Sequence, residues 1–165
     1  MRLREFLLAT LAGGLLACSP QSGAETLAPP DQAAVAATHP VSGLQIIPVT
    51  VTANGTVHRF RTELADTPEA QARGLMFRTE LGPDEAMIFP RTERPSPASF
   101  WMKNTPLPLD IIFIGPDGRI TNIAAQTVPY SLDSVRSQGN VIGVLEIAGG
   151  RAAELGIERG AKVEW

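Results

Sequence analysis

Apolar and polar residues alternate in two neighbouring stretches, and this pattern indicates a β-hairpin. The alternation runs from Ile46 to Ala53 and again from Thr56 to Leu64. It has the period at which successive side chains point to opposite faces of a strand. Asn54-Gly55 lies between the two runs, and both positions of such a turn take positive φ. We therefore predict two antiparallel strands joined by a tight turn.

The rest of the apolar pattern predicts more strands than helices. Asp66-Thr67-Pro68-Glu69 is typical of a helix start, and Gly74 suits the end of a short helix. A second short helix is expected over 151–155. Further strands are expected at 86–89, 100–103, 109–114, 119–125, 141–147 and 161–165, with loops at 91–97 and 130–140. The predicted fold is α+β: a mostly antiparallel, strongly curved sheet or partial β-barrel with two short helices.

Residues 1–18 have the pattern of a lipoprotein-type signal peptide. Arg2 and Arg4 precede an apolar run over 6–17 that is too short to span a bilayer. The run ends in Leu15-Leu16-Ala17-Cys18, which resembles a bacterial lipobox, and Cys18 is the only cysteine in the chain. We therefore predict lipidation of Cys18 and a membrane partner through that anchor. Two alternatives stay open: ordinary cleavage near residues 22–24, which gives a soluble periplasmic protein, and Cys18 as a plain apolar residue of the signal.

The composition after Cys18 predicts a tether before the folded part. Residues 19–43 are rich in proline and alanine, lack aromatic residues and carry only Glu25 and Asp31 as charges. Such a segment buries too little surface to offset its ordering entropy, so we expect it to be disordered. Ser19 resembles the residue found after the cysteine in lipoproteins sent to the outer membrane. We expect export to the periplasmic face of a bacterial membrane, with residues 44–165 forming a single domain.

Charge and missing residue types exclude several classes of function. Residues 44–165 contain 12 lysines and arginines against 14 aspartates and glutamates, without a basic run, so nucleic acid is not an expected partner. His39 and His58 are the only histidines, which leaves no ligand set for zinc and no thiol for catalysis. We therefore predict no metal and no cofactor. Gly149-Gly150 before Arg151 could offer backbone N–H groups to an anion, although a turn that needs two glycines explains the pair better.

Four sequence blocks resemble an uncharacterised family of small bacterial and archaeal secreted or lipoprotein domains, numbered 192 among the domains of unknown function. The blocks lie at 73–78, 87–89, 100–110 and 145–150. The resemblance implies a compact fold of the kind predicted above. It implies no reaction, because the family has no established function.

Polar residues in these blocks are the candidates for a binding site. Asp110 and Glu146 each lie between apolar neighbours in an expected strand, where a carboxylate needs a cation or several hydrogen-bond donors. One interpretation is a structural ion pair, for example Arg73 with Glu146, with Arg78 as another available cation. The other is a polar cleft. Phe100 and Trp101 should face opposite sides of a strand, so at least one belongs to the core. The candidate ligand-binding residues are Arg73, Trp101, Lys103, Asn104, Thr105, Asp110 and Glu146.

Three functions follow from these residues. The leading prediction is an envelope-tethered, non-catalytic domain that binds a small polar ligand, an envelope glycan or a protein partner, with no residue assigned a catalytic role. The second is a glycan hydrolase that uses Asp110 and Glu146 as paired carboxylates, which would have to share one face at about 5–9.5 Å. The third is a purely structural envelope protein.

Overall fold

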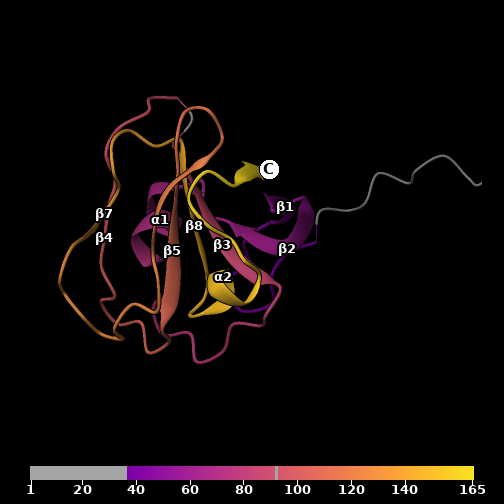
Figure 1. Ribbon diagram of the computed structural model, residues 1–165. Helices are drawn as coiled ribbons and strands as arrows, with labels where there is room; N and C mark the ends of the chain where they lie inside the picture. The colour runs from indigo at the N-terminus through magenta and orange to yellow at the C-terminus, as the bar shows by residue number, and fades with distance from the viewer. Residues whose placement is uncertain (1–36, 92) are drawn as a thin grey trace, which may run out of the picture. The chain divides into compact units, whose positions relative to one another are not determined.

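A strongly curved, nearly closed sheet of seven strands with two short helices forms the folded part of the chain (Figure 1). The computed structural model describes residues 37–91 and 93–165. The predictions for the signal peptide, for Cys18 and for most of the tether lie outside these residues. None of the helices in the described part of the chain has the length and hydropathy that a membrane crossing requires.

The predicted hairpin is confirmed in its register and its turn. Strand β1 (Ile46–Ala53) pairs with β2 (Thr56–Leu64), and the register closes at Ala53 opposite Thr56. Asn54 and Gly55 have φ values of 49° and 79°, the left-handed conformation that the two-residue turn demands.

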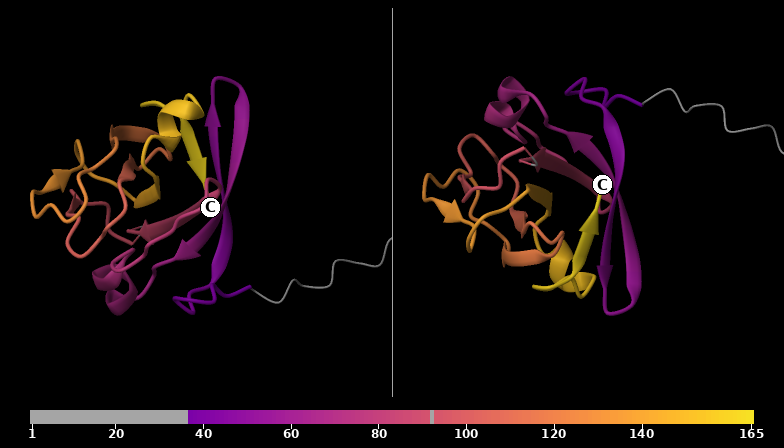
Figure 2. Two further views of the ribbon diagram at one scale, coloured as in Figure 1. Left: turned by 90° about the horizontal axis from the view of Figure 1, so that it is seen from below. Right: turned by 90° about the horizontal axis from the view of Figure 1, so that it is seen from above.

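The other five strands extend this hairpin into a sheet that almost closes on itself. They are β3 (Glu85–Pro90), β5 (Leu109–Ile114), β6 (Ile120–Ala124), β8 (Gly143–Ala148) and β9 (Lys162–Glu164), and the strand order is β6-β5-β8-β3-β2-β1-β9. Only β2 and β3 pair in parallel. The two end strands meet at an isolated bridge between Arg119 and Lys162. Figure 2 shows β9 lying beside β1, as their register also states.

The central strands β3, β5 and β8 are buried on both faces, which explains their continuous apolar runs. Their inner face joins side chains from all seven strands in one core, for example Val51, Ile112, Leu145 and Val163. Their outer face forms a second core that includes Phe89, Ile111 and Phe113, and that also contains Leu75, Ala98 and Met102 from segments outside the seven-stranded sheet. The fold therefore has two cores separated by one layer of sheet.

The second core is covered by irregular chain and a small additional sheet. Helix α1 (Pro68–Arg73) begins at Thr67, whose hydroxyl accepts a hydrogen bond from Ala70 N–H at 3.2 Å, and ends at Gly74 as predicted. Helix α2 (Arg151–Glu154) lies after β8. Strand β4 (Ser99–Phe100) ends earlier than the predicted strand at 100–103, and β7 (Val135–Arg136) forms within the predicted loop at 130–140.

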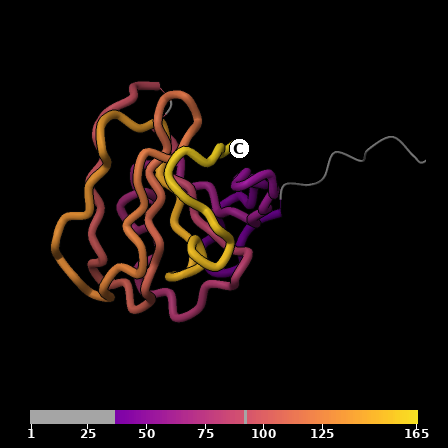
Figure 3. The backbone as a smooth tube through the Cα atoms, viewed as in Figure 1, coloured from indigo at the N-terminus to yellow at the C-terminus, as the bar shows by residue number. Residues whose placement is uncertain are grey.

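An irregular pair of segments explains the short β4. Met102 N–H donates to the Ser131 carbonyl at 2.9 Å and Tyr130 N–H donates to the Thr105 carbonyl at 3.1 Å, outside any strand ladder. Segments 99–105 and 130–137 consequently run side by side along one flank of the molecule (Figure 3). Trp101 and Lys103 therefore lie in a loop.

Candidate functional site

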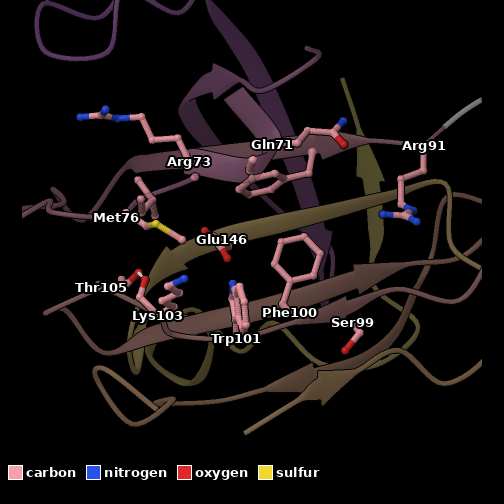
Figure 4. Close-up of a pocket in the computed structure, with 14 residues that line it drawn as sticks. Gln71, Arg73, Met76, Arg91, Ser99, Phe100, Trp101, Lys103, Thr105 and Glu146 are labelled. Atoms are coloured by element: carbon pink, nitrogen blue, oxygen red, sulfur yellow. Dashed lines mark hydrogen bonds between the residues drawn. The ribbon is translucent and has the colours of Figure 1, made fainter. Parts of the chain in front are cut away.

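A cavity of about 280 Å³ opens between the end of α1, the end of β3 and the loop after β4, with β8 contributing Glu146 (Figure 4). Its apolar lining includes three aromatic rings, those of Phe89, Phe100 and Trp101. Its charged lining consists of Arg73, Arg91, Lys103 and Glu146. The volume is close to the lower end of the range for small-molecule sites, roughly 300–1,000 Å³.

Glu146 is the polar centre of this cavity. It is paired with Met87 on β3 and Ile111 on β5, so it lies on the outer face of the sheet among apolar residues. Only 5% of its surface is exposed, and it makes no hydrogen bond to any part of the chain that the structure describes. Burial raises the pKa of the Glu146 carboxyl to about 8. Most molecules therefore carry the neutral acid at pH 7.

An aromatic wall explains the low polarity around that carboxyl. The rings of Phe89 and Phe100 meet edge to face at 5.1 Å between centroids, and Phe100 meets Phe113 in the same way at 6.2 Å. Gly74 lies against the tip of the Phe89 ring, because a Cβ at this position would be 3.4 Å from its Cζ atom. The glycine that ends α1 thus also lets the chain approach the wall closely.

Trp101 and Lys103 form the mouth of the cavity. Trp101 is 51% exposed, and the Lys103 ammonium lies 5.2 Å from the centroid of its ring, within cation–π distance. Figure 4 shows Phe100, Trp101 and Lys103 pointing from one wall toward Glu146. Phe100 is half-buried against the second core. This agrees with the expectation that at least one of the two aromatics belongs to the core.

The loops beside the mouth hold three non-glycine residues in the left-handed region. Phe77, Asn104 and Tyr130 have φ values of 64°, 55° and 61°. Phe77 N–H donates to the Asn104 carbonyl at 2.8 Å, and Tyr130 N–H bonds to Thr105, so one network connects the three strained positions. The side chains of Phe77 and Tyr130 are 66% and 63% exposed. Such strain is costly and is concentrated at functional sites, which marks this end of the domain independently of the cavity.

The structure places five of the seven candidate residues along the cavity: Arg73, Trp101, Lys103, Thr105 and Glu146. Arg73 lies at its edge, where it is exposed and its guanidinium points away from Glu146 (Figure 4). Asn104 does not line the cavity. It forms a turn in which its side-chain amide contacts the Met76 sulfur at 3.8 Å.

Asp110 lies on the other face of the sheet, and its position corrects the paired-carboxylate hypothesis. It pairs with Ile147 on β8, whereas its neighbour Ile111 pairs with Glu146, so the two carboxylates face opposite sides. Asp110 is fully buried and accepts backbone N–H bonds from Gln126 at 2.8 Å, Gly150 at 2.9 Å and Ala152 at 2.8 Å. The anion that the backbone N–H groups at the Gly149-Gly150 turn bind is therefore the Asp110 carboxylate of the protein itself.

The proposed ion pair between Arg73 and Glu146 is also corrected. The buried pair is formed by Arg78, which bonds both oxygens of Glu63 at 2.5 and 2.6 Å. Ser42 donates a further bond to Glu63 at 2.5 Å, and His39 lies 3.7 Å from the same carboxylate. This cluster attaches residues 39–42 to the sheet.

The sequence did not identify several residues that line the cavity. Gln71 and Arg91 come from segments predicted only as helix and loop, and nothing in their local pattern distinguishes them from surface residues. Phe89 has the pattern of an ordinary core residue. The family resemblance did point to part of the cavity, because Gly74, Phe89 and Glu146 belong to three of its four sequence blocks.

The structure defines a small, nearly closed β-sheet domain with a cavity on the outer face of its sheet. The chain belongs to the family DUF192, described as "Uncharacterized ACR", whose pattern matches residues 49–165. This confirms the resemblance found in the sequence.

Two crystal structures are similar to the chain. A protein of unknown function from Novosphingobium aromaticivorans DSM 12444 is 59% identical, with a TM-score of 0.77 over 81% of this chain and 94% of that one. A "putative transcription regulator" from Sinorhizobium meliloti 1021 is 36% identical, with a TM-score of 0.70 over 73% of this chain and 94% of that one. No curated protein matches the chain.

Proposed function

We propose that this domain is a non-catalytic binding module that holds a small polar ligand in the cavity beneath Trp101. The observation that carries the proposal is Glu146, a buried carboxyl that faces an aromatic cavity and has no hydrogen-bond partner within the described residues. The Glu146 oxygens open onto the cavity and are not used by the described chain, so a ligand that enters the cavity can form hydrogen bonds with them.

The shape of the cavity favours a ring-shaped ligand with hydroxyl groups. Trp101 presents a half-exposed face at the mouth, and Phe89 and Phe100 continue the apolar wall inward. A saccharide ring has apolar C–H faces that pack on aromatic rings and hydroxyl groups that a carboxyl can bind. An envelope glycan, or a single sugar derived from one, is therefore the ligand class that we place first.

The carboxylates do not support hydrolysis by the two-carboxylate mechanism. Glu146 is the only acid that lines the cavity in the described part of the chain, and Asp110 is held by three backbone N–H groups on the opposite face. Paired general acid and base require both groups at one bond of the substrate. Binding without catalysis thus fits the geometry best.

We also propose no nucleic-acid partner, although one similar structure carries a regulator's description. The folded residues 44–165 have more acidic than basic residues and contain no run of basic residues. A nucleic-acid surface needs clustered unpaired cations along one face.

Fluorescence of Trp101 tests the binding function directly. The chain, expressed from its full-length sequence with Trp165→Phe, keeps a single tryptophan at the mouth of the cavity. We expect acrylamide to quench Trp101 strongly. We expect one member of a panel of D-glucose, D-galactose, N-acetylglucosamine, D-glucuronate, glycine betaine and L-lysine to protect it. If no member protects Trp101 or raises the melting temperature at 10 mM, the proposal of a small polar ligand is wrong.

Matched variants separate the cavity from the rest of the surface. Glu146→Gln and Trp101→Leu should each weaken binding at least tenfold, measured by calorimetric titration because Trp101→Leu removes the fluorescent probe, while each variant keeps a cooperative thermal transition. Glu164→Gln, at the exposed end of β9, should bind as the parent does. Equal affinity in all three variants would place the ligand elsewhere.

The envelope location remains a proposal that rests on the sequence of residues 1–43. We propose that Cys18 is lipidated after export and that the following segment tethers the domain to the membrane. Metabolic labelling with an alkyne fatty acid should label the parent and not Cys18→Ala, and the parent should fractionate with membranes. Export of an unlabelled soluble protein would instead favour ordinary signal cleavage.

A further inference from the structure

We infer that the ligand is anionic, a sugar acid whose carboxylate lies against Lys103 at the mouth and whose hydroxyl groups reach Glu146. This inference rests on the proposed function and specifies its ligand class. The evidence for it is which charged side chains line the cavity and which of them form ion pairs within the protein.

The cations around the cavity are not neutralised by the protein. Within residues 37–91 and 93–165, Arg73, Arg91 and Lys103 form no ion pair, whereas Arg78, Arg151 and Lys162 do. Arg91 donates one hydrogen bond, to the Ser96 hydroxyl at 3.3 Å. Of these cations, Arg73 points away from Glu146, whereas Lys103 at the mouth presents an unpaired positive charge to a ligand.

The one acid in the lining does not cancel this charge at neutral pH. Glu146 is buried among apolar groups, and that burial favours its protonated form. A neutral carboxyl donates one hydrogen bond and accepts another, which matches the hydroxyl groups of a sugar. It also imposes no repulsion on an anion bound a few ångströms away.

The positions of Trp101 and Lys103 suit a ring that carries a carboxylate. The Lys103 ammonium lies 5.2 Å from the centroid of the Trp101 ring. A sugar ring stacked on the exposed part of Trp101 would present a substituent at its edge within reach of that ammonium. The small volume, about 280 Å³, limits the ligand inside the cavity to about one such ring.

An ammonium ligand is the main alternative in chemical terms, and the charges disfavour it. Aromatic rings around a carboxyl are a common setting for a quaternary ammonium group. Here, however, three cations line the same cavity, and Lys103 already lies over the Trp101 ring. A bound cation would be repelled by the Lys103 ammonium at the mouth.

A titration with three small molecules tests the charge preference. The full-length Trp165→Phe protein is titrated with D-glucuronate, with D-glucose, which has a neutral hydroxymethyl group in place of the carboxylate, and with choline. We expect D-glucuronate to bind at least tenfold more tightly than D-glucose at low salt, with the preference reduced at 0.5 M NaCl. Choline should not bind.

The chain offers an internal control, because Lys103 and Lys162 are its two lysines. D-Glucuronate should protect Lys103 from acetylation, measured by mass spectrometry, and leave Lys162 unprotected. Lys103→Gln should abolish the preference for D-glucuronate and retain binding of D-glucose. Lys162→Gln should change neither. An acidic oligosaccharide, tri-galacturonate, is titrated beside the free sugar acid; tighter binding would assign the site to a glycan rather than to a free metabolite.

The outcomes distinguish the two levels of the proposal. Equal affinity for D-glucose and D-glucuronate, or a preference for choline, overturns the anionic inference and leaves a small-ligand site in place. If a neutral member of the larger panel protects Trp101 and D-glucuronate does not, the anionic inference is likewise overturned and the small-ligand site is kept. Failure of every compound overturns both.

Discussion

Asp110 and Glu146 lie on neighbouring strands, one register position apart, with their carboxyl groups on opposite faces of the same sheet. Asp110 accepts three backbone hydrogen bonds in the inner face, while Glu146 has no hydrogen-bond partner among the described residues and faces the cavity. Two acids in similar apolar surroundings thus have different roles. One joins parts of the fold, and the other opens onto the cavity.

Removal of the Asp110 carboxylate should destabilise the domain without a direct effect on the ligand site. Asp110→Ala leaves three buried N–H groups without an acceptor, and we expect a loss of about 3–5 kcal/mol in the free energy of unfolding. Asp110→Asn should cost less, about 1–3 kcal/mol, because its remaining oxygen can keep the bonds to Gln126 and Gly150. Urea unfolding measures both.

The exposed Asp133 provides the control for this series. Asp133→Asn should change the free energy of unfolding by less than about 0.5 kcal/mol. If Asp110→Ala unfolds at the same urea concentration as the parent, the three backbone bonds do not stabilise the turn as the structure indicates.

Glu146 should make the domain less stable as the pH rises. Its pKa is about 8 in the folded protein and near its ordinary value of 4.5 in the unfolded chain. Between these values the folded state keeps a proton that the unfolded state releases, so the free energy of unfolding falls by up to about 1.4 kcal/mol per pH unit. The other charged groups that line the same cavity are Arg73, Arg91 and Lys103.

Glu146→Gln should remove this slope, since glutamine has no proton to release. We expect the variant to be more stable than the parent at pH 8 and close to it at pH 4.5, as measured by urea unfolding at several pH values. Glu164→Gln at an exposed site serves as the control. Parallel curves for the parent and Glu146→Gln would show that Glu146 ionises normally in the folded state.

Local features of the fold followed from the sequence because they depend on a few adjacent residues. The alternation of β1 and β2, the Asn54-Gly55 turn and the Thr67 cap are each determined within one short segment. The predicted fold class and the family resemblance were also confirmed. The same reasoning gave Lys103, Trp101 and Glu146 as site candidates.

Local pattern could not predict which face of the sheet each residue of the central strands occupies. Because β5 and β8 are buried on both sides, apolar periodicity does not show which face Asp110 or Glu146 occupies. The partners of Asp110 come from 16 to 42 residues further along the chain, and those partners are backbone groups with no sequence signature. The predicted ion pair was wrong for a similar reason: Arg73 and Arg78 both precede β3, and only the fold brings Arg78 to Glu63.

The buried pair of Arg78 and Glu63 should be among the most sensitive positions for stability. Arg78→Met leaves a buried carboxylate with Ser42 and His39 as its remaining contacts, so we expect a loss of about 3–5 kcal/mol. The double variant Arg78→Met with Glu63→Leu should recover part of that loss, because no charge then stays buried without a partner. Urea unfolding of the single and double variants measures the coupling. A double variant that loses the sum of both single losses would show that the two side chains act independently.

Affinity for a sugar acid should fall as the pH rises through the range in which Glu146 loses its proton. Above pH 8 the ionised Glu146 carboxyl places a negative charge in the same cavity as the ligand. We expect the dissociation constant for D-glucuronate, followed by Trp101 fluorescence, to rise by about tenfold between pH 7 and pH 9. D-Glucose should show a much smaller change, and Glu146→Gln should bind D-glucuronate weakly but with a flat pH profile. A flat pH profile in the parent, or an equal loss of affinity for D-glucose, would show that Glu146 does not contribute to the preference for an anionic ligand. That preference would then depend on Lys103 alone.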